Sequence, residues 1–167
     1  GDIRENDFVK GKFDILICQR VLINLLNIED QKLALNNLLA KVNDRGLLIF
    51  CETFGSGLEK LNLARKEFDL DPIKAPYHNL CLPDDFFEHD DITSYMDLDR
   101  GFKYQNIFSA HYYVSRVLYP ALTKALNLPF KRNSEFIKFM SSAVGDIEEV
   151  YSPLQFRIFK KNGPKVS

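Results

Sequence analysis

The feature that most constrains the fold is a pair of apolar segments joined by one amphipathic helix. Residues 13–18 and 46–52 are almost continuously apolar, which is typical of strands buried on both faces. Between them, leucines recur at helical spacing over residues 30–43, after a helix start at residues 27–30 that places acids in the first turn. A turn at residues 43–46 ends this helix. Two strands joined through a helix predict a parallel βαβ unit with a right-handed crossover, and therefore an α/β fold.

The rest of the chain predicts inserted helices and a closing pair of strands. Helical patterns occupy residues 57–68, 112–126 and 134–144, the second interrupted at Tyr119 and Pro120. Alternation over 102–108 and 154–160 predicts two strands that pair antiparallel at one end of the sheet. Three prolines in residues 72–83 predict an irregular connection. The acidic stretch 84–99 predicts a solvated short helix and loop.

Composition limits the classes of protein to which the chain can belong. With 167 residues the chain is long enough for a single domain with its own core. A formal net charge of -1 argues against a nucleic-acid binder, and no apolar run has the length of a membrane helix. Three widely spaced cysteines indicate neither a disulfide framework nor a zinc site, and they favour a reducing, cytoplasmic setting. The three histidines do not have metal-ligand spacing, so we expect no metal.

The first fifty residues contain no Gly-rich turn between a strand and a helix. Nucleotide-binding α/β proteins use such a turn to hold phosphates. We therefore expect residues 1–167 to form one domain that is the C-terminal half of a larger cofactor-dependent enzyme.

The segment that follows the first strand carries a family resemblance. Phe13-Asp14-Ile15-Leu16-Ile17-Cys18-Gln19-Arg20-Val21-Leu22-Ile23-Asn24-Leu25 resembles the fourth strand and the following loop of class I S-adenosylmethionine-dependent methyltransferases. It is most similar to a bacterial subgroup with an Arg-x-Leu-Ile-Asn-Leu segment there. Similar blocks follow in the same order over nearly the whole chain: Asp30-Gln31, Cys51-Glu52, Gly57-Leu58, Leu61-Asn62, Arg65, residues 76–79, 112–120 and 151–154.

The resemblance implies a partial Rossmann-like sheet. The family has seven strands, five parallel and helix-linked and a terminal antiparallel pair, and this chain would supply strands four to seven. It further implies S-adenosylmethionine as cofactor and a small-molecule or sugar-like acceptor. Strand one, its Gly-rich loop and the acid that binds the cofactor ribose are not among these residues. We expect them upstream, and we expect residues 1–167 alone to be inactive.

Candidate cofactor residues lie where strands end, because ligands of open α/β sheets bind there. The resemblance places an acidic residue near the cofactor adenine at the start of the chain. The predicted cofactor set is Asp2, Ile3, Cys18, Gln19 and Arg20. Arg20 could contact the cofactor carboxylate or an acidic substrate, or it could form a structural pair with Glu52 on the neighbouring strand.

Glu52 and His78 are the candidate general bases. A partly desolvated carboxylate at a strand end could have a raised pKa, whereas pairing with Arg20 would lower the pKa of Glu52. His78 lies in a proline-flanked loop, where a histidine could take a proton near neutral pH or simply be exposed. Methyl transfer needs a base only when the acceptor must lose a proton.

The candidate substrate residues come from several segments. Asn62 and Arg65 share a helix face and could form a lid, or a solvated polar face. Asn24 could instead cap the next segment, and Tyr112 could be packing. The predicted substrate set is Asn24, Asn62, Arg65, Asn79, His111, Tyr112 and Arg116.

Two other classes of function stay open. The chain could be a non-catalytic α/β interaction module that assembles, for example as a homo-oligomer, through strand 13–18 as an open sheet edge. It could also be half of another Rossmann-like enzyme, such as a dehydrogenase, with the choice of cofactor set by the missing half.

Overall fold

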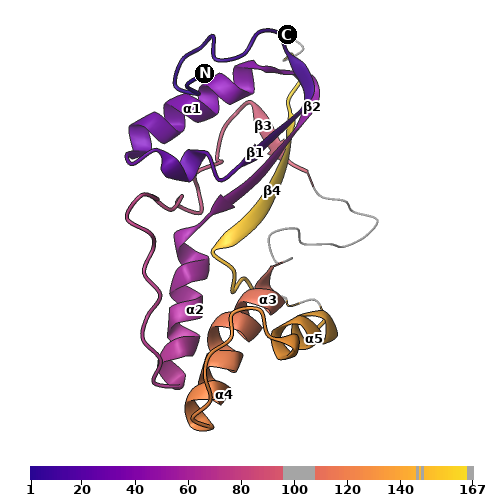
Figure 1. Ribbon diagram of the computed structural model, residues 1–167. Coiled ribbons are helices and arrows are strands. Elements are labelled where there is room, and N and C mark those ends of the chain that lie inside the picture. The colour runs from indigo at the N-terminus through magenta and orange to yellow at the C-terminus, as the bar shows by residue number, and fades with distance from the viewer. Residues whose placement is uncertain (96–107, 146, 148, 165–167) are drawn as a thin grey trace.

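The described residues fold as a four-stranded mixed sheet with helices at one face and at one end (Figure 1). The computed structural model describes residues 1–95, 108–145, 147 and 149–164. Across the sheet the strand order is β1 (Phe13–Gln19), β2 (Val42–Thr53), β4 (Leu154–Lys161) and β3 (Ile92–Ser94). β1 and β2 are parallel, and β4 is antiparallel to both of its neighbours. The predicted α/β class and partly parallel sheet are confirmed.

Helix α1 (Ile28–Ala40) makes the crossover between the parallel strands. The Asn27 side chain accepts a hydrogen bond of 2.7 Å from the Asp30 amide, which is the expected helix cap. The helix ends three residues earlier than expected because residues 43–46 belong to an irregular start of β2. There the register with β1 jumps from Phe13↔Val42 to Ile15↔Leu47.

Aromatic rings fill the core between α1 and the sheet. The Phe50 and Phe87 ring centroids lie 4.5 Å apart, and those of Phe87 and Phe159 lie 5.0 Å apart. The prediction of a solvated segment over 84–99 is therefore wrong for Phe86, Phe87 and Ile92, all of which are buried. Acidic neighbours face solvent, while these apolar side chains enter the core.

The last strand is confirmed as β4, but its outer partner was not expected. Ile92–Ser94 pairs antiparallel with β4, with Ile92 opposite Lys161. Of the strand predicted at 102–108, residues 102–107 lie outside the described residues. Phe108 is described and immediately precedes a helix.

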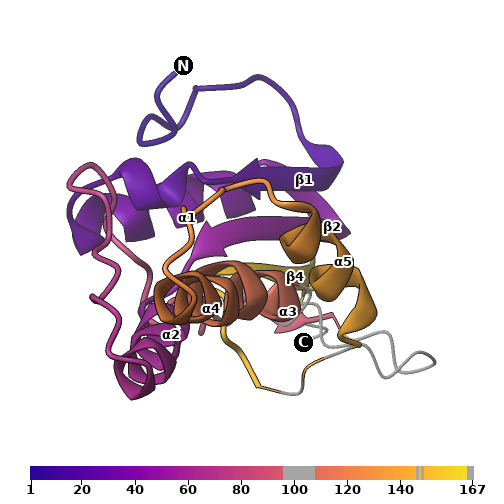
Figure 2. The ribbon, with the colours of Figure 1, turned by 60° about the horizontal axis from the view of Figure 1, so that its bottom comes forward.

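The remaining helices gather beyond the carboxyl end of β2 (Figures 1 and 2). The predicted helix 112–126 is helical throughout, and its irregularity lies one turn earlier than expected, in a π-helical segment that we call the π-turn. The elements are α2 (Gly55–Glu67), α3 (Ser109–Tyr113), the π-turn (Val114–Leu118), α4 (Tyr119–Ala125) and α5 (Glu135–Ala143).

Among the described strands, β1 lies at the border of the sheet with β2 as its neighbour. Cys18 belongs to the buried core, and Leu16 is partly buried and packs against it. Ile15 and Ile17 point to the other face, where they are 56% and 68% exposed. No helix in the described ranges has the length and apolar character needed to cross a membrane.

Candidate functional site

The loop after β1 is built on the carboxylate of Glu52. This side chain is fully buried. Its Oε1 accepts hydrogen bonds from the amides of Val21 at 2.9 Å and Leu22 at 3.2 Å, and Oε2 accepts a longer one from Ile23 at 3.4 Å. These amides open the short 3-10 helix Leu22–Asn24, whose free N–H groups a carboxylate satisfies well. Glu52 therefore fixes the course of the loop.

Burial governs the protonation of this carboxylate. It raises the pKa of Glu52, while the hydrogen bonds from Val21 and Leu22 act in the opposite direction. The Cys18 thiol lies 3.4 Å from Oε1, and burial together with the charge of Glu52 raises the pKa of that thiol. Because the loop after β1 encloses the Glu52 carboxylate, Glu52 affects the site by holding that loop in its conformation.

Arg20 does not pair with Glu52. No ion pair joins the two residues in the part of the chain that the structure describes, so that alternative is wrong. Arg20 adopts a left-handed backbone with φ of 52°, and its amide donates to the Cys51 carbonyl at 2.9 Å. The Asn24 side chain donates to the Arg20 carbonyl at 2.7 Å and so closes the loop behind it, whereas the cap of the next helix is Asn27 and not Asn24. This turn leaves the Arg20 guanidinium outside the pocket of Glu52.

Arg20 instead lines a cavity of about 270 Å³ beyond the carboxyl ends of β1 and β2, which we call the strand-end cavity. Thr53 at the end of β2 also lines it. Lys74 and Arg132 bring two more cations, and none of the described residues that line it is Asp or Glu. The site is therefore electropositive in a chain of net charge -1.

Two uncharged polar groups also border the strand-end cavity. The Oδ1 atom of Asn79 is buried and has no hydrogen-bond partner among the described residues. Burial raises the pKa of the Tyr112 hydroxyl, and the nearby charges of Arg116 and Arg20 oppose that shift. An unpaired buried acceptor is costly, so a donor group on a ligand would be well matched to Asn79.

Two predicted substrate residues on α2 hold the irregular segment before β3. The Asn62 side chain donates to the Ile73 carbonyl at 2.9 Å and accepts from its amide at 2.8 Å. Arg65 Nε donates to the Asp71 carbonyl at 2.7 Å. Asn62 is thus not part of a solvated face, and both residues fix the wall that carries Lys74 and Asn79.

Arg65 also explains how the π-turn is accommodated. Pro120 has no N–H, so the Arg116 carbonyl one helical turn earlier loses its usual donor. Arg65 Nη1 donates to that carbonyl. A side chain from α2 thereby replaces the missing backbone bond.

Three other predicted site residues do not line the strand-end cavity. His111 and Arg116 line a second cavity beside the π-turn, where His111 Nδ1 lies 3.3 Å from Ser141 Oγ. Burial lowers the pKa of His111, and the charge of Arg116 adds to the effect. His78 is exposed, beside the ring of Tyr77.

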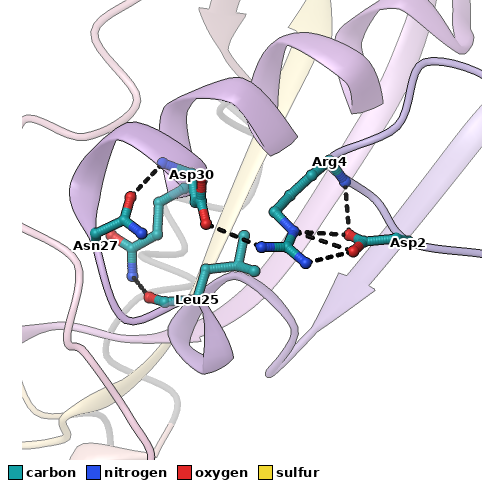
Figure 3. Close-up of polar contacts among 6 residues, drawn as sticks. Asp2, Arg4, Leu25, Asn27 and Asp30 are labelled. Carbon is teal, nitrogen blue, oxygen red and sulfur yellow. Dashed lines mark hydrogen bonds and ion pairs between the residues drawn. The ribbon is translucent and has the colours of Figure 1, made fainter.

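The N-terminal residues are anchored to α1. Arg4 forms ion pairs with Asp2 at 2.5 Å and with Asp30 at 3.1 Å (Figure 3). The hydrogen bonds from Arg4 lower the pKa of Asp2 to about 2. The Asn37 side chain donates to the Ile3 carbonyl at 3.0 Å. Gln19, the last residue of β1, is exposed.

Sequence reasoning missed Lys74 and Arg132. Both lie in segments without regular structure, Arg132 directly after Lys131, and no periodic pattern distinguishes them from surface residues. Within the described ranges, no group of three or more His, Cys, Asp or Glu side chains could hold a metal ion.

Comparison with known proteins shows a distant likeness among solved structures. No protein-family model and no curated protein matches the sequence. The chain is similar to a solved structure described as "Crystal structure of MccD protein", with 16% sequence identity and a TM-score of 0.40. The match covers 97% of this chain and 66% of that chain, so this chain spans just under two thirds of its length.

Proposed function

We propose that this chain is the substrate-side part of an S-adenosylmethionine-dependent methyltransferase that acts on a small-molecule acceptor. The observation that carries the proposal is the strand-end cavity at the carboxyl edge of two parallel strands, whose described lining residues include three cations and no Asp or Glu. Open α/β sheets bind ligands at this edge. The arrangement of a parallel pair followed by an antiparallel pair also supports it, since the family resemblance implies that order.

In this proposal the loop after β1 serves the cofactor. A guanidinium binds a carboxylate through paired, charge-assisted hydrogen bonds, so Arg20 is the partner for the carboxylate of S-adenosylmethionine. Glu52 is a positioning residue because it holds the amides of Val21 and Leu22. Asp2, Ile3 and Gln19 belong to the proposed cofactor side, and Cys18, which is buried in the core, supports the loop from below through Glu52.

The acceptor lies on the side of the helices. Methyl transfer depends mainly on in-line positioning, because the sulfonium is already activated. Asn79 and Tyr112 border the strand-end cavity and orient the acceptor, while Asn62 and Arg65 hold the segment that carries Lys74 and Asn79. His78 is the proposed base for an acceptor that must lose a proton.

Calorimetric titration with S-adenosylmethionine tests the proposal, using the longest polypeptide that the gene encodes. Saturable binding is expected, weakened about tenfold or more by Arg20→Gln because one charge-assisted contact is lost. Lys160→Gln removes an exposed cation on β4 and serves as the matched control. An absence of heat at high ligand concentration would contradict the proposal, and binding of a nicotinamide cofactor instead would favour a dehydrogenase.

A second candidate is a non-catalytic interaction module, and the observation that favours it is the open border at β1. Phe13, Ile15 and Ile17 are between 41% and 68% exposed along a strand without proline or lysine. Exposed edges of this kind pair with other strands. Assembly that is lost in Ile17→Lys, combined with no binding of S-adenosylmethionine, would support the module over the enzyme.

A further inference from the structure

The cavity beside the π-turn has a lining made almost entirely of hydrogen-bond donors and cations. Its volume is about 560 Å³, and we call it the π-turn cavity. Ser115 and Arg116 reach it from the π-turn, Arg132 from the segment before α5, and Lys138 from α5. None of its described lining residues is Asp or Glu.

Ser115 has an unused hydroxyl at this cavity. The residue is 2% exposed, and its Oγ has no hydrogen-bond partner among the described residues. A helical serine usually donates to the carbonyl of the preceding turn or to solvent. Thr123 on α4 does so, with its hydroxyl 3.0 Å from the Tyr119 carbonyl. An unpaired buried hydroxyl is unfavourable, which points to an acceptor that is bound there in the functional state.

The unpaired positive charge of the cavity comes from Arg116 and Arg132. Neither the Arg116 nor the Arg132 guanidinium forms an ion pair or side-chain hydrogen bond with any residue in the described ranges. Lys138, in contrast, is paired with Glu135 at 2.6 Å. Two unpaired guanidinium groups match a phosphate monoester, whose charge near neutral pH is about -1.5 to -2. A carboxylate would leave one of the two charges unpaired.

We propose that the π-turn cavity binds the phosphate monoester group of a small molecule, with Ser115 Oγ donating to it and Arg116 and Arg132 neutralising it. Arg132 lines both this cavity and the strand-end cavity. A phosphate held here therefore directs the rest of the molecule toward Tyr112 and Asn79. The role of the phosphate as a handle on the methyl acceptor rests on the proposed function, whereas the binding itself does not.

The test is thermal unfolding and calorimetry of the 167-residue chain with phenyl phosphate and inorganic phosphate, without S-adenosylmethionine. A ligand that binds only the folded state raises Tm. Ser115→Ala should weaken phenyl phosphate binding about tenfold and Arg116→Gln about a hundredfold, as expected for lost hydrogen bonds to a charged group. Lys160→Gln, on the exposed side of β4, should leave binding unchanged.

Ser115→Ala keeps the proposal testable if Arg116→Gln folds poorly. Removing an unpartnered hydroxyl should leave Tm without ligand unchanged or raised. The proposal is overturned if phenyl phosphate binds wild type and Ser115→Ala equally, if acetate at equal ionic strength binds as tightly, or if no saturable binding occurs. Any of these results leaves the binding of S-adenosylmethionine to be decided separately.

Discussion

The two faces of β1 are chemically alike and structurally different. Cys18 is buried in the core and Leu16 packs against it, whereas Ile15 and Ile17 point away and are more than half exposed. A continuously apolar strand is typical of burial on both faces. The comparison teaches that one face of the strand is covered by the described residues, whereas the other leaves Ile15 and Ile17 exposed, and we propose that this second face is a contact surface. The interaction-module candidate depends on that surface.

Truncation in the core should produce the largest effect and sharpen the contrast between the faces. Phe50→Ala removes a fully buried ring that contacts Phe87 and Phe159, and it should lower the free energy of unfolding by about 3–5 kcal/mol. Ile17→Ala on the open face should lower it by under about 1 kcal/mol. Urea unfolding measures both. Equal losses of unfolding free energy in Phe50→Ala and Ile17→Ala would mean that the face of β1 with Ile15 and Ile17 is already covered.

The next largest effect is expected at Glu52. Glu52→Ala leaves the buried amides of the loop without an acceptor, and it should destabilise the fold by about 2–4 kcal/mol. Glu52→Gln retains one oxygen and should lose about half as much. Thermal or urea unfolding of the two variants, with Glu59→Gln on α2 as an exposed control, checks the order. A loss in Glu52→Ala no larger than in the control would show that the loop does not depend on this carboxylate.

The stability difference between wild type and Glu52→Gln should depend on pH. Burial raises the pKa of Glu52 above its ordinary value of 4.5. A carboxyl group with a raised folded-state pKa contributes stability that is fully present below its unfolded pKa and is lost as pH rises through the folded one. The advantage of wild type should therefore shrink as pH rises from below 4.5 through the raised value. An advantage that grows over that range would contradict the predicted direction.

A smaller effect concerns the bond from Arg65 to the π-turn. Arg65→Met should destabilise the chain by about 1–2 kcal/mol, because the Arg116 carbonyl loses its donor. In the Pro120→Ala background the restored N–H can supply that bond, so the same change should cost about 0.5–1 kcal/mol less. The bond from Arg65 to Asp71 is common to both backgrounds and cancels in this double-mutant cycle. If the effects of Arg65→Met and Pro120→Ala on the free energy of unfolding were strictly additive, Arg65 would not replace the missing backbone bond.

Local signals in the sequence were sufficient for much of the fold. The start of α1 was predictable because its cap is a side chain three residues from the amide it binds. Residues 13–18 and 154–160 were predictable from their apolar pattern alone. The β3 strand was not, because it has three residues and follows an acidic segment whose apolar side chains are buried only in the tertiary fold.

The candidate site was predictable only where it follows strand ends. Arg20 was selected because it comes directly after a buried strand, and it does line the cavity at that edge. Lys74 and Arg132 lie 54 and 112 residues further along the chain and meet Arg20 through packing that no local pattern encodes. The predicted ion pair between Arg20 and Glu52 was wrong, because the left-handed turn at Arg20 separates the two side chains.

Light scattering coupled to size-exclusion chromatography tests the central claim, that the exposed face of β1, which carries Ile15 and Ile17, is a contact surface. The 167-residue chain should elute as a dimer or larger species as its concentration rises, because Ile15 and Ile17 remain to be covered. Ile17→Lys should elute as a monomer while its free energy of unfolding changes by under about 1 kcal/mol. A wild-type chain that stays monomeric up to its solubility limit would contradict the claim.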